Sequence, residues 1–317
     1  VEFNDLIRGN IQFNADSLGD FIIVRSNGIP AYNFAAVVDD HHMEISHVIR
    51  GEDHLSNTAL QMLLYRSLDF VPPHFAHHSL ILGEDRTKLS KRHGSVAVCD
   101  FRNLGILSEA LSNYLYLLGS SFAKGREIFI REEMTRQFSL EKTGRGGAVF
   151  DIKKLKWTNR ICIRNCTTGR LLELLSPFIS NAGYDCSSTD MEWLYNVVDS
   201  VKTDISTLAE IGDHIDIFFD DHFEISEDAM AILDKKDSVK VIKIVRRMLE
   251  SGVTDYRIIM EAARSETGFN GKALFMPVRV AVTGRTRGPE LDTLFPILGR
   301  KSLMDRIDNV LRIKENM

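Results

Sequence analysis

The first part of the chain carries the apolar pattern of an α/β arrangement. ISHVIRG (45–51) and SLILG (79–83) are short apolar runs with β-branched residues, and such runs predict strands. Between them, leucines recur at helical spacing over residues 60–68, polar side chains at 56–58 offer N-caps, and two prolines (72–73) end the helix. Strand, helix and strand in this order predict a parallel crossover unit of an α/β sheet.

Immediately upstream, residues 20–40 predict a β-hairpin. DFIIVR (20–25) is an apolar run with β-branched residues, and residues 26–30 (SNGIP) supply turn chemistry. YNFAAVVDD (32–40) is expected to continue as the second strand.

From about residue 107 the pattern becomes helical. LSEALSNYLYLLG (107–119) predicts a helix that closes at Gly119, REEMTRQFSL (131–140) predicts another, and a glycine-rich link (143–151) follows. Past about residue 165, strand signals are few. Helical periodicity dominates TGRLLELLSPFI, MEWLYNVVDSV, SVKVIKIVRRMLE and SLMDRIDNVLRI. The sequence therefore predicts an α/β part followed by an all-α region.

Composition is that of an ordinary soluble globular protein. Of 317 residues, 44% are hydrophobic and 26% are charged, so we expect two domains, with three possible. No apolar run approaches the ~20 residues that cross a bilayer, and the polar start VEFNDLIRGN is not a signal peptide. A first residue other than Met indicates a fragment or a processed chain. The four cysteines match no known zinc or disulfide spacing, and scattered thiols fit a reducing cytosol, so we expect a cytoplasmic location and no zinc.

The formal net charge of −5 argues weakly against a nucleic-acid partner, although local basic patches can still contact phosphates. Two candidate patches are present. They comprise Lys153, Lys154 and Lys156 beside Trp157, and Lys240, Lys243, Arg246 and Arg247. Taken alone, each patch is better interpreted as a solvated helix face.

The strongest local signal is the pentapeptide KLSKR (88–92). It follows the strand predicted at 79–83 and a polar turn (83–86), so it lies where ligands bind in open α/β sheets. Attack on the α-phosphate of ATP places negative charge on the phosphoryl oxygens and the leaving pyrophosphate, and fixed cations aimed there stabilise the transition state. Judged by composition alone, a basic surface loop is the better interpretation.

The surroundings of this pentapeptide carry a family resemblance. KLSKR is similar to the KMSKS signature of class I aminoacyl-tRNA synthetases. The segments 25–68, PPHFAHHSLIL and KLSKRHG resemble glutamyl-tRNA synthetases of the bacterial type, and the resemblance continues through EALSNYLYLLG, REIF, FDIKKLKWTN and MPVRVAVTG. It spans essentially the whole chain, and so long a series of ordered motifs is far more specific than a single pentapeptide.

The resemblance implies that Tyr32 and Arg50 hold the substrate glutamate. A guanidinium can grip a carboxylate through two donors, which selects glutamate over neutral analogues. Without the family, Arg50 is expected to pair with Glu52 or Asp53, and Tyr32 to be a core aromatic. Asp53 corresponds to a position that contacts the ribose or base of ATP, and it also suits a helix N-terminus.

The resemblance further implies an ATP site with its accompanying Mg²⁺. Its members are Asp53, Ile81, Lys88, Leu89, Ser90, Lys91 and Arg92, with Lys91 and Lys88 as the catalytic cations. Histidines also cluster in this part of the chain, at positions 41, 42, 47, 54, 74, 77 and 78. A protein metal site is the less favoured interpretation of that cluster, because alternate residues of a strand face opposite ways.

Class I enzymes need a second signature, HxGH, which this chain lacks. VEFNDLIRGNIQFN resembles the end of the acceptor-binding insertion, so the chain corresponds to the C-terminal two-thirds of the family. We expect it to be an incomplete catalytic unit that does not form the adenylate by itself.

Three regions are expected: the insertion's end and the second half of a Rossmann-like catalytic fold (1–86), a stem-contact region (87–165) and a helical anticodon-binding region (166–317). The implied reaction joins glutamate to tRNA(Glu) with ATP, by a monomer that needs bound tRNA for the first step. Two alternatives stay open: an enzyme that also charges tRNA(Gln), and an inactive tRNA-binding protein. Glutaminyl-tRNA synthetase is disfavoured, because its anticodon region is a β-barrel.

Overall fold

The chain forms two compact units in a computed structural model that describes residues 1–94, 97–121, 125–184, 186, 189–219 and 223–315. The first unit contains residues 1–102 and 107–158, and the second contains residues 103–106 and 159–317.

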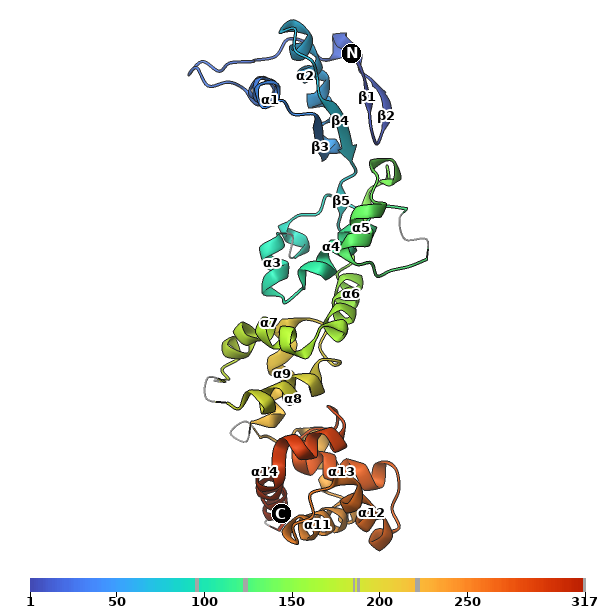
Figure 1. Cartoon of the computed structure of the whole chain (residues 1–317), viewed down its shortest axis with the longest axis vertical. Helices are drawn as coiled ribbons and strands as arrows, with labels where there is room; N and C mark the ends of the chain where they lie inside the picture. Colours follow the sequence, from blue (N-terminus) through green and yellow to red (C-terminus); the bar gives the residue numbers. More distant parts are fainter. Residues whose placement is uncertain (95–96, 122–124, 185, 187–188, 220–222, 316–317) are drawn as a thin grey trace. The chain divides into compact units, whose positions relative to one another are not determined.

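The first unit is built on a four-stranded mixed sheet with strand order β2-β1-β4-β3 (Figure 1). Its strands are β1 (Glu2–Asp5), β2 (Gly9–Gln12), β3 (His47–Gly51) and β4 (His74–His78). β4 runs parallel to both β1 and β3, whereas β1 and β2 are antiparallel. Helices α1 (Tyr32–His42) and α2 (Leu55–Ser67) pack against the sheet, because Val37, Met62 and Tyr65 share one buried cluster with Phe3 and Phe75.

The predicted parallel crossover is confirmed, but its second strand is not the one expected. The unit is β3, a short 3₁₀ turn η2 (Glu52–His54), α2 and then β4, which starts five residues before the expected SLILG strand. Residues 81–82 instead form the two-residue strand β5 (Ile81–Leu82), parallel to β6 (Ala148–Val149). The pattern missed β4 because one of its three buried positions is the histidine His77.

Both strands of the predicted hairpin are wrong, because residues 20–25 form no strand beyond an isolated bridge at Val24 and residues 32–42 form α1. The turn itself is present: Val24 and Pro30 form an antiparallel bridge, and the amide of Ala31 donates to the carbonyl of Ile23. β-Branched residues at 37 and 38 favoured a strand, but tertiary packing overrides this propensity, since the fully buried Val37 packs into the core beneath α2.

Beyond β5 the first unit is mainly helical, and both predicted helices are confirmed. The remaining elements are η1 (Ala15–Ser17), η3 (Lys91–His93), α3 (Val98–Asn103), α4 (Ser108–Leu117), α5 (Arg131–Gln137), η4 (Leu140–Lys142) and α6 (Ile152–Asn165), which continues into the second unit. Gly119 has φ +67° just after α4, and its carbonyl accepts from the amide of Gly144 at 2.7 Å. A left-handed backbone of this kind favours glycine.

The described residues of the second unit contain helices and no strand, so the predicted all-α region is confirmed. The elements are α7 (Thr168–Asn181), α8 (Met191–Val201), η5 (Leu208–Ile211), α9 (Gly212–Ile215), η6 (Asp216–Phe218), α10 (Glu227–Leu233), α11 (Lys236–Glu250), α12 (Tyr256–Thr267), α13 (Lys272–Thr283) and α14 (Leu291–Glu315). α14 is interrupted at Gly299, whose backbone is not helical. Within the described part of the chain, no helix is long and apolar enough to cross a membrane.

Candidate active site

Arg50 of β3 is held by four hydrogen bonds to neutral groups. Its Nε donates to His77 Nε2 (3.2 Å), Nη1 donates to the Tyr32 hydroxyl (3.2 Å), and Nη2 donates to Thr58 Oγ1 and Gln61 Oε1 (both 2.7 Å). The partners come from β4, the first residue of α1 and one face of α2. Four bonds from three elements fix the plane of the guanidinium.

The two acids that the sequence offered as partners of Arg50 are engaged elsewhere. Glu52 pairs with Arg8 at 2.5 Å and accepts from the amide of Leu80, and Asp53 pairs with Lys88 at 2.7 Å. The expected ion pair of Arg50 with Glu52 or Asp53 is therefore not formed. Among the described residues, no carboxylate lies within ion-pair distance of the Arg50 guanidinium.

Tyr32 is not a core aromatic. Its side chain starts α1 and is 52% exposed, its ring lies 5.8 Å from the His54 ring, and its hydroxyl accepts from Arg50. The hydroxyl hydrogen therefore remains available as a donor beside the guanidinium.

Asp5 and His77 form a buried pair behind Arg50. Asp5 Oδ2 lies 2.6 Å from His77 Nδ1, and both side chains are fully inaccessible to solvent. Burial acts to raise the pKa of Asp5, but hydrogen bonds from the Arg8, His77 and Ile7 amides and from the His77 ring outweigh it and lower the pKa. Burial lowers the pKa of His77 despite the neighbouring carboxylate. The pair is therefore a carboxylate and a neutral imidazole.

The buried hydroxyl of Tyr65 lies close enough to Asp40 and Arg50 to feel their charges. The side chain of Tyr65 is 1% exposed, and its hydroxyl has no hydrogen-bond partner among the described residues. Burial, and then the charge of Asp40, raise the pKa of Tyr65 to about 12, while Arg50 acts in the opposite direction. Tyr65 therefore remains a neutral phenol at physiological pH.

The KLSKR segment leaves β5 through a tight turn. The amide of Gly83 donates to Thr87 O (2.8 Å), and Leu89 N donates to Ile81 O (2.9 Å). Asp85 Oδ1 accepts from the amide and hydroxyl of Thr87 (2.9 and 2.8 Å). The turn thus brings the predicted residues Ile81 and Leu89 together through their backbones.

The three cations of the segment differ in their partners. Lys88 donates to Asp53, and this hydrogen bond lowers the pKa of Asp53. Arg92 donates to Asp85 Oδ2 (3.3 Å) and to Thr87 Oγ1 (2.6 Å), so it supports the turn. Lys91 is exposed and makes no ion pair or hydrogen bond with a described residue through its side chain. Lys91 is therefore the cation that is open to a ligand.

The structure brings together three pairs of the predicted residues: Tyr32 with Arg50, Asp53 with Lys88, and Ile81 with Leu89. It also adds four residues that the sequence interpretation missed: Asp5, Thr58, Gln61 and His77. Helical spacing of Thr58 and Gln61 places both on one face of α2, which is a signal that the sequence contained. The role of His77 depends on its register opposite Arg50 and could not be read from spacing.

Several histidines of this region make ring contacts within the chain. His41 stacks on Phe70 with ring centroids 3.6 Å apart, and the His47 and His74 rings lie 5.0 Å apart. No cluster of three or more potential ligands occurs in the parts of the chain that the structure describes.

Ion pairs engage Lys154 of the first basic patch and three of the four cations of the patch on α11. Lys154 pairs with Glu127 (3.0 Å), and on α11 Lys240 pairs with Asp237 (3.2 Å), Arg246 with Asp308 (2.5 Å) and Arg247 with Glu266. The α11 patch is thus largely neutralised, as expected for a solvated helix face.

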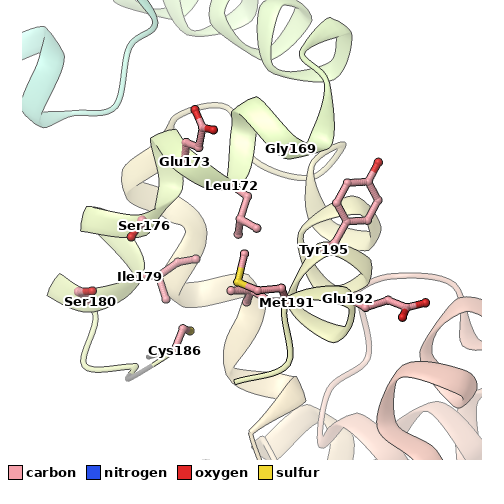
Figure 2. A pocket seen from close by; sticks show the side chains of 11 residues that line it. Gly169, Leu172, Glu173, Ser176, Ile179, Ser180, Cys186, Met191, Glu192 and Tyr195 are labelled. Carbon is pink, nitrogen blue, oxygen red and sulfur yellow. The ribbon is translucent and has the colours of Figure 1, made fainter. Parts of the chain in front are cut away.

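A cavity of about 790 Å³ lies in the second unit between α7 and α8 (Figure 2). Its lining is apolar at Leu172, Ile179 and Met191 and carries the carboxylates of Glu173 and Glu192, with no lysine or arginine. A cavity with this lining does not suit a ligand that carries phosphates.

Comparison with known families agrees with these two units. Residues 1–157 match the family described as "tRNA synthetases class I (E and Q), catalytic domain", and residues 170–311 match "Anticodon binding domain". The first match assigns residues 1–157 to the catalytic domain of the class I tRNA synthetases, in agreement with the α/β fold of the first unit.

Comparison with curated relatives identifies the family within this class. The chain is 52% identical to glutamate–tRNA ligase 2 of Syntrophus aciditrophicus (strain SB) over 100% of the chain and 66% of the relative. It is 45% identical to glutamate–tRNA ligase 1 of Caldicellulosiruptor saccharolyticus over 97% of the chain and 65% of the relative. A crystal structure of a glutamate tRNA ligase from Elizabethkingia meningosepticum, in complex with its amino acid, superposes with a TM-score of 0.87 at 28% identity, over 98% of this chain and 66% of that one. The chain belongs to the glutamate–tRNA ligase family, and it spans about two thirds of the length of these relatives.

Proposed function

We propose that the chain carries the glutamate- and ATP-binding groups of a glutamate–tRNA ligase, which activates glutamate with ATP and transfers it to the 3′ end of tRNA(Glu). The observation that supports this most directly is Arg50, a guanidinium oriented by four neutral partners and without an ion pair to a carboxylate among the described residues. A cation in this state is a receptor for an anionic ligand.

Arg50 and Tyr32 together supply two donors for the side-chain carboxylate of glutamate. A guanidinium has five N–H donors, and four are used within the protein, so one donor on Nη1 remains. The Tyr32 hydroxyl, which accepts from the same Nη1, provides the second donor. A carboxylate can accept from both donors with separate oxygens, whereas the amide of glutamine has a single acceptor oxygen. This pair of donors therefore favours glutamate over glutamine.

Lys91 and Lys88 are the cations that stabilise the adenylation step. The α-carboxylate of glutamate attacks the α-phosphate of ATP, and pyrophosphate leaves, so negative charge grows on the phosphate oxygens. The Lys88–Asp53 pair is solvent-exposed, with side chains 63% and 38% accessible, and such pairs contribute little stability. Lys88 can therefore exchange its ion pair with Asp53 for one with a phosphate of ATP at a small cost in free energy. Asp53 is then able to accept hydrogen bonds from the ribose hydroxyls of ATP.

Other ligands follow from the family. Mg²⁺ accompanies ATP. The nucleotide site is shaped by Arg92, Ser90, Leu89 and Ile81. The helical second unit contacts the anticodon arm of tRNA. We also propose a cytoplasmic monomer with the three regions 1–86, 87–165 and 166–317.

Charging of tRNA(Glu) with labelled glutamate tests the function. We would assay the 317-residue chain alone and a hybrid in which it replaces the aligned segment of the Syntrophus aciditrophicus relative. We expect charging by the hybrid at a rate close to that of the intact relative. A folded hybrid that binds tRNA(Glu) but does not charge it would identify the chain as an inactive tRNA-binding protein. The same assay with tRNA(Gln) tests whether one or both tRNAs are charged.

A further inference from the structure

Asp5, His77 and Arg50 lie side by side on three neighbouring strands. The sheet order places β1 next to β4 and β4 next to β3, and Arg50 is the register partner of His77 in the parallel β3–β4 pair. Side chains of register partners project from the same face of a sheet. Asp5 reaches this face from the end of β1, where its Oδ1 also accepts from the amides of Ile7 (3.0 Å), Arg8 (2.8 Å) and His77 (3.2 Å).

These contacts define which nitrogen of His77 carries the proton. A carboxylate can only accept, so the 2.6 Å contact between Asp5 Oδ2 and His77 Nδ1 requires hydrogen on Nδ1. Arg50 Nε can only donate, so its 3.2 Å contact with Nε2 requires a lone pair there. Both requirements are met by one species, the neutral imidazole protonated on Nδ1.

The remaining neighbours agree with that assignment. Thr58 Oγ1 accepts from Arg50 Nη2 and lies 2.9 Å from His77 Nε2, so its own hydrogen can be donated to the Nε2 lone pair. Nε2 then acts as an acceptor for both Thr58 and Arg50, as the assignment requires. The charged or titratable groups that face His77 are Asp5 from β1, Arg50 from β3 and His54 from η2, while Arg8 donates to the His77 carbonyl.

We propose that Asp5 and His77 are positioning residues that hold Arg50 in the orientation that accepts the side-chain carboxylate of glutamate. The inference rests on the proposed role of Arg50. Asp5 locks the imidazole tautomer, and the imidazole accepts from Nε, so the guanidinium is anchored on the side away from Tyr32. The carboxylate also supplies a negative charge one ring away from Arg50, without occupying the donors that the ligand needs.

Acidification should therefore weaken glutamate binding before it affects ATP. A proton on His77 Nε2 would turn the acceptor of Arg50 Nε into a donor and place a second cation against the guanidinium. We expect the KM for glutamate in the active hybrid to rise as the pH falls through the pKa of His77, which burial lowers from the ordinary 6.5, while the KM for ATP stays constant.

Two variants separate positioning from simple structural damage. Asp5→Asn removes the charge but keeps a side chain of the same size, and we expect the KM for glutamate to rise about tenfold with kcat nearly unchanged. His77→Phe removes both ring nitrogens and should raise the KM for glutamate at least as much, whereas His77→Gln should restore part of the affinity through an amide that can accept from Arg50. His74→Gln, at the exposed end of the same strand, is the matched control and should behave as the parent.

The tautomer can be tested without enzyme activity, on the 317-residue chain itself. In ¹⁵N-histidine-labelled protein at neutral pH, we expect the two-bond correlation pattern of a buried histidine protonated on Nδ1, and its loss in Asp5→Asn. Protonation on Nε2, or an imidazolium, would overturn the proposed positioning of Arg50 by Asp5 through His77. If Arg50→Ala leaves the KM for glutamate unchanged, the proposed role of Arg50 is wrong. If Arg50→Ala raises this KM and Asp5→Asn does not, only the positioning role of Asp5 and His77 is wrong.

Discussion

Arg50 and Lys91 are both cations assigned to ligand binding in the first unit, yet the structure holds them in opposite ways. Arg50 is fixed by four hydrogen bonds from three elements, with a fully buried Asp5–His77 pair behind it. Lys91 is exposed on a one-turn 3₁₀ segment, and its neighbours Lys88 and Arg92 are held by exposed ion pairs.

The difference agrees with the ligand proposed for each cation. Distinguishing a carboxylate from an amide requires donors whose positions are set before the ligand arrives, because selectivity depends on unpaired groups being costly. Stabilising charge that develops during a reaction requires cations that can reach the phosphates when these are in place. Rigidity therefore belongs at Arg50, and accessible cations belong in the KLSKR segment.

The largest expected effect tests the rigid side of this comparison. Arg50→Ala in the hybrid should lower kcat/KM for glutamate by roughly 30-fold to several thousandfold, because losing a buried charge-assisted contact costs about 2–5 kcal/mol. Steady-state kinetics with glutamate and ATP varied separately would measure it. Arg50→Lys retains the charge without the planar guanidinium, so its kcat/KM for glutamate should lie between those of the parent and of Arg50→Ala. Unchanged kinetic constants for glutamate would remove Arg50 from the site.

Lys91→Ala tests the accessible side. We expect the rate of glutamate- and tRNA-dependent pyrophosphate exchange to fall by about a hundredfold, because one cation at the transferring phosphoryl group is lost. The Kd for tRNA(Glu) should stay nearly unchanged in a filter-binding assay, and so should the KM for glutamate. An equal loss of tRNA binding would contradict the assigned role.

The buried Asp5–His77 pair predicts a loss of stability that begins near pH 6.5, where the exposed Lys88–Asp53 pair contributes none. Burial lowers the pKa of His77 from its usual 6.5, so below this pH the unfolded chain binds a proton that the folded chain does not. Stability should therefore fall by about 1.4 kcal/mol per pH unit from near 6.5 down to the lowered pKa. Asp5, whose pKa lies below 3.8, stabilises the fold above that pH and adds a further loss as the pH falls through its folded value.

Urea unfolding of the 317-residue chain at stepped pH would measure this dependence. His77→Gln has no titrating ring, so it should lack the loss of stability that begins near pH 6.5. It should retain the loss at lower pH that comes from Asp5. The same slope in the variant and the parent between pH 6.5 and 4 would show that another group is responsible.

The smallest expected effect concerns the unpartnered hydroxyl of Tyr65. Tyr65→Phe removes a buried polar atom that makes no hydrogen bond with a described residue, so we expect the free energy of unfolding to stay constant or rise by up to about 1 kcal/mol. Thermal and urea unfolding would measure the change. A loss of more than about 1 kcal/mol would show that the hydroxyl has a partner in solution.

Periodicity predicted those helices whose buried faces are long and regular. The segments that became α7, α8, α11 and α14 each repeat apolar residues over several turns, so local pattern and tertiary packing agree. The same argument failed at residues 32–40, where β-branched residues belong to a helix, and at β4, where a histidine occupies a core position. In both places the environment of the residue, rather than its type, decides the structure.

By itself, the sequence determined the family, the order of an α/β part and a helical part, and the identity of Arg50, Tyr32 and the KLSKR cations, because motifs and periodicity are local properties. Only the tertiary structure decided how these groups are used. Strand register brings His77 opposite Arg50, β1 brings Asp5 behind it, and a turn after β5 brings Lys88 to Asp53. Those contacts join residues 27 to 72 positions apart, and hydrogen bonding across such distances depends on the sheet and not on spacing along the chain.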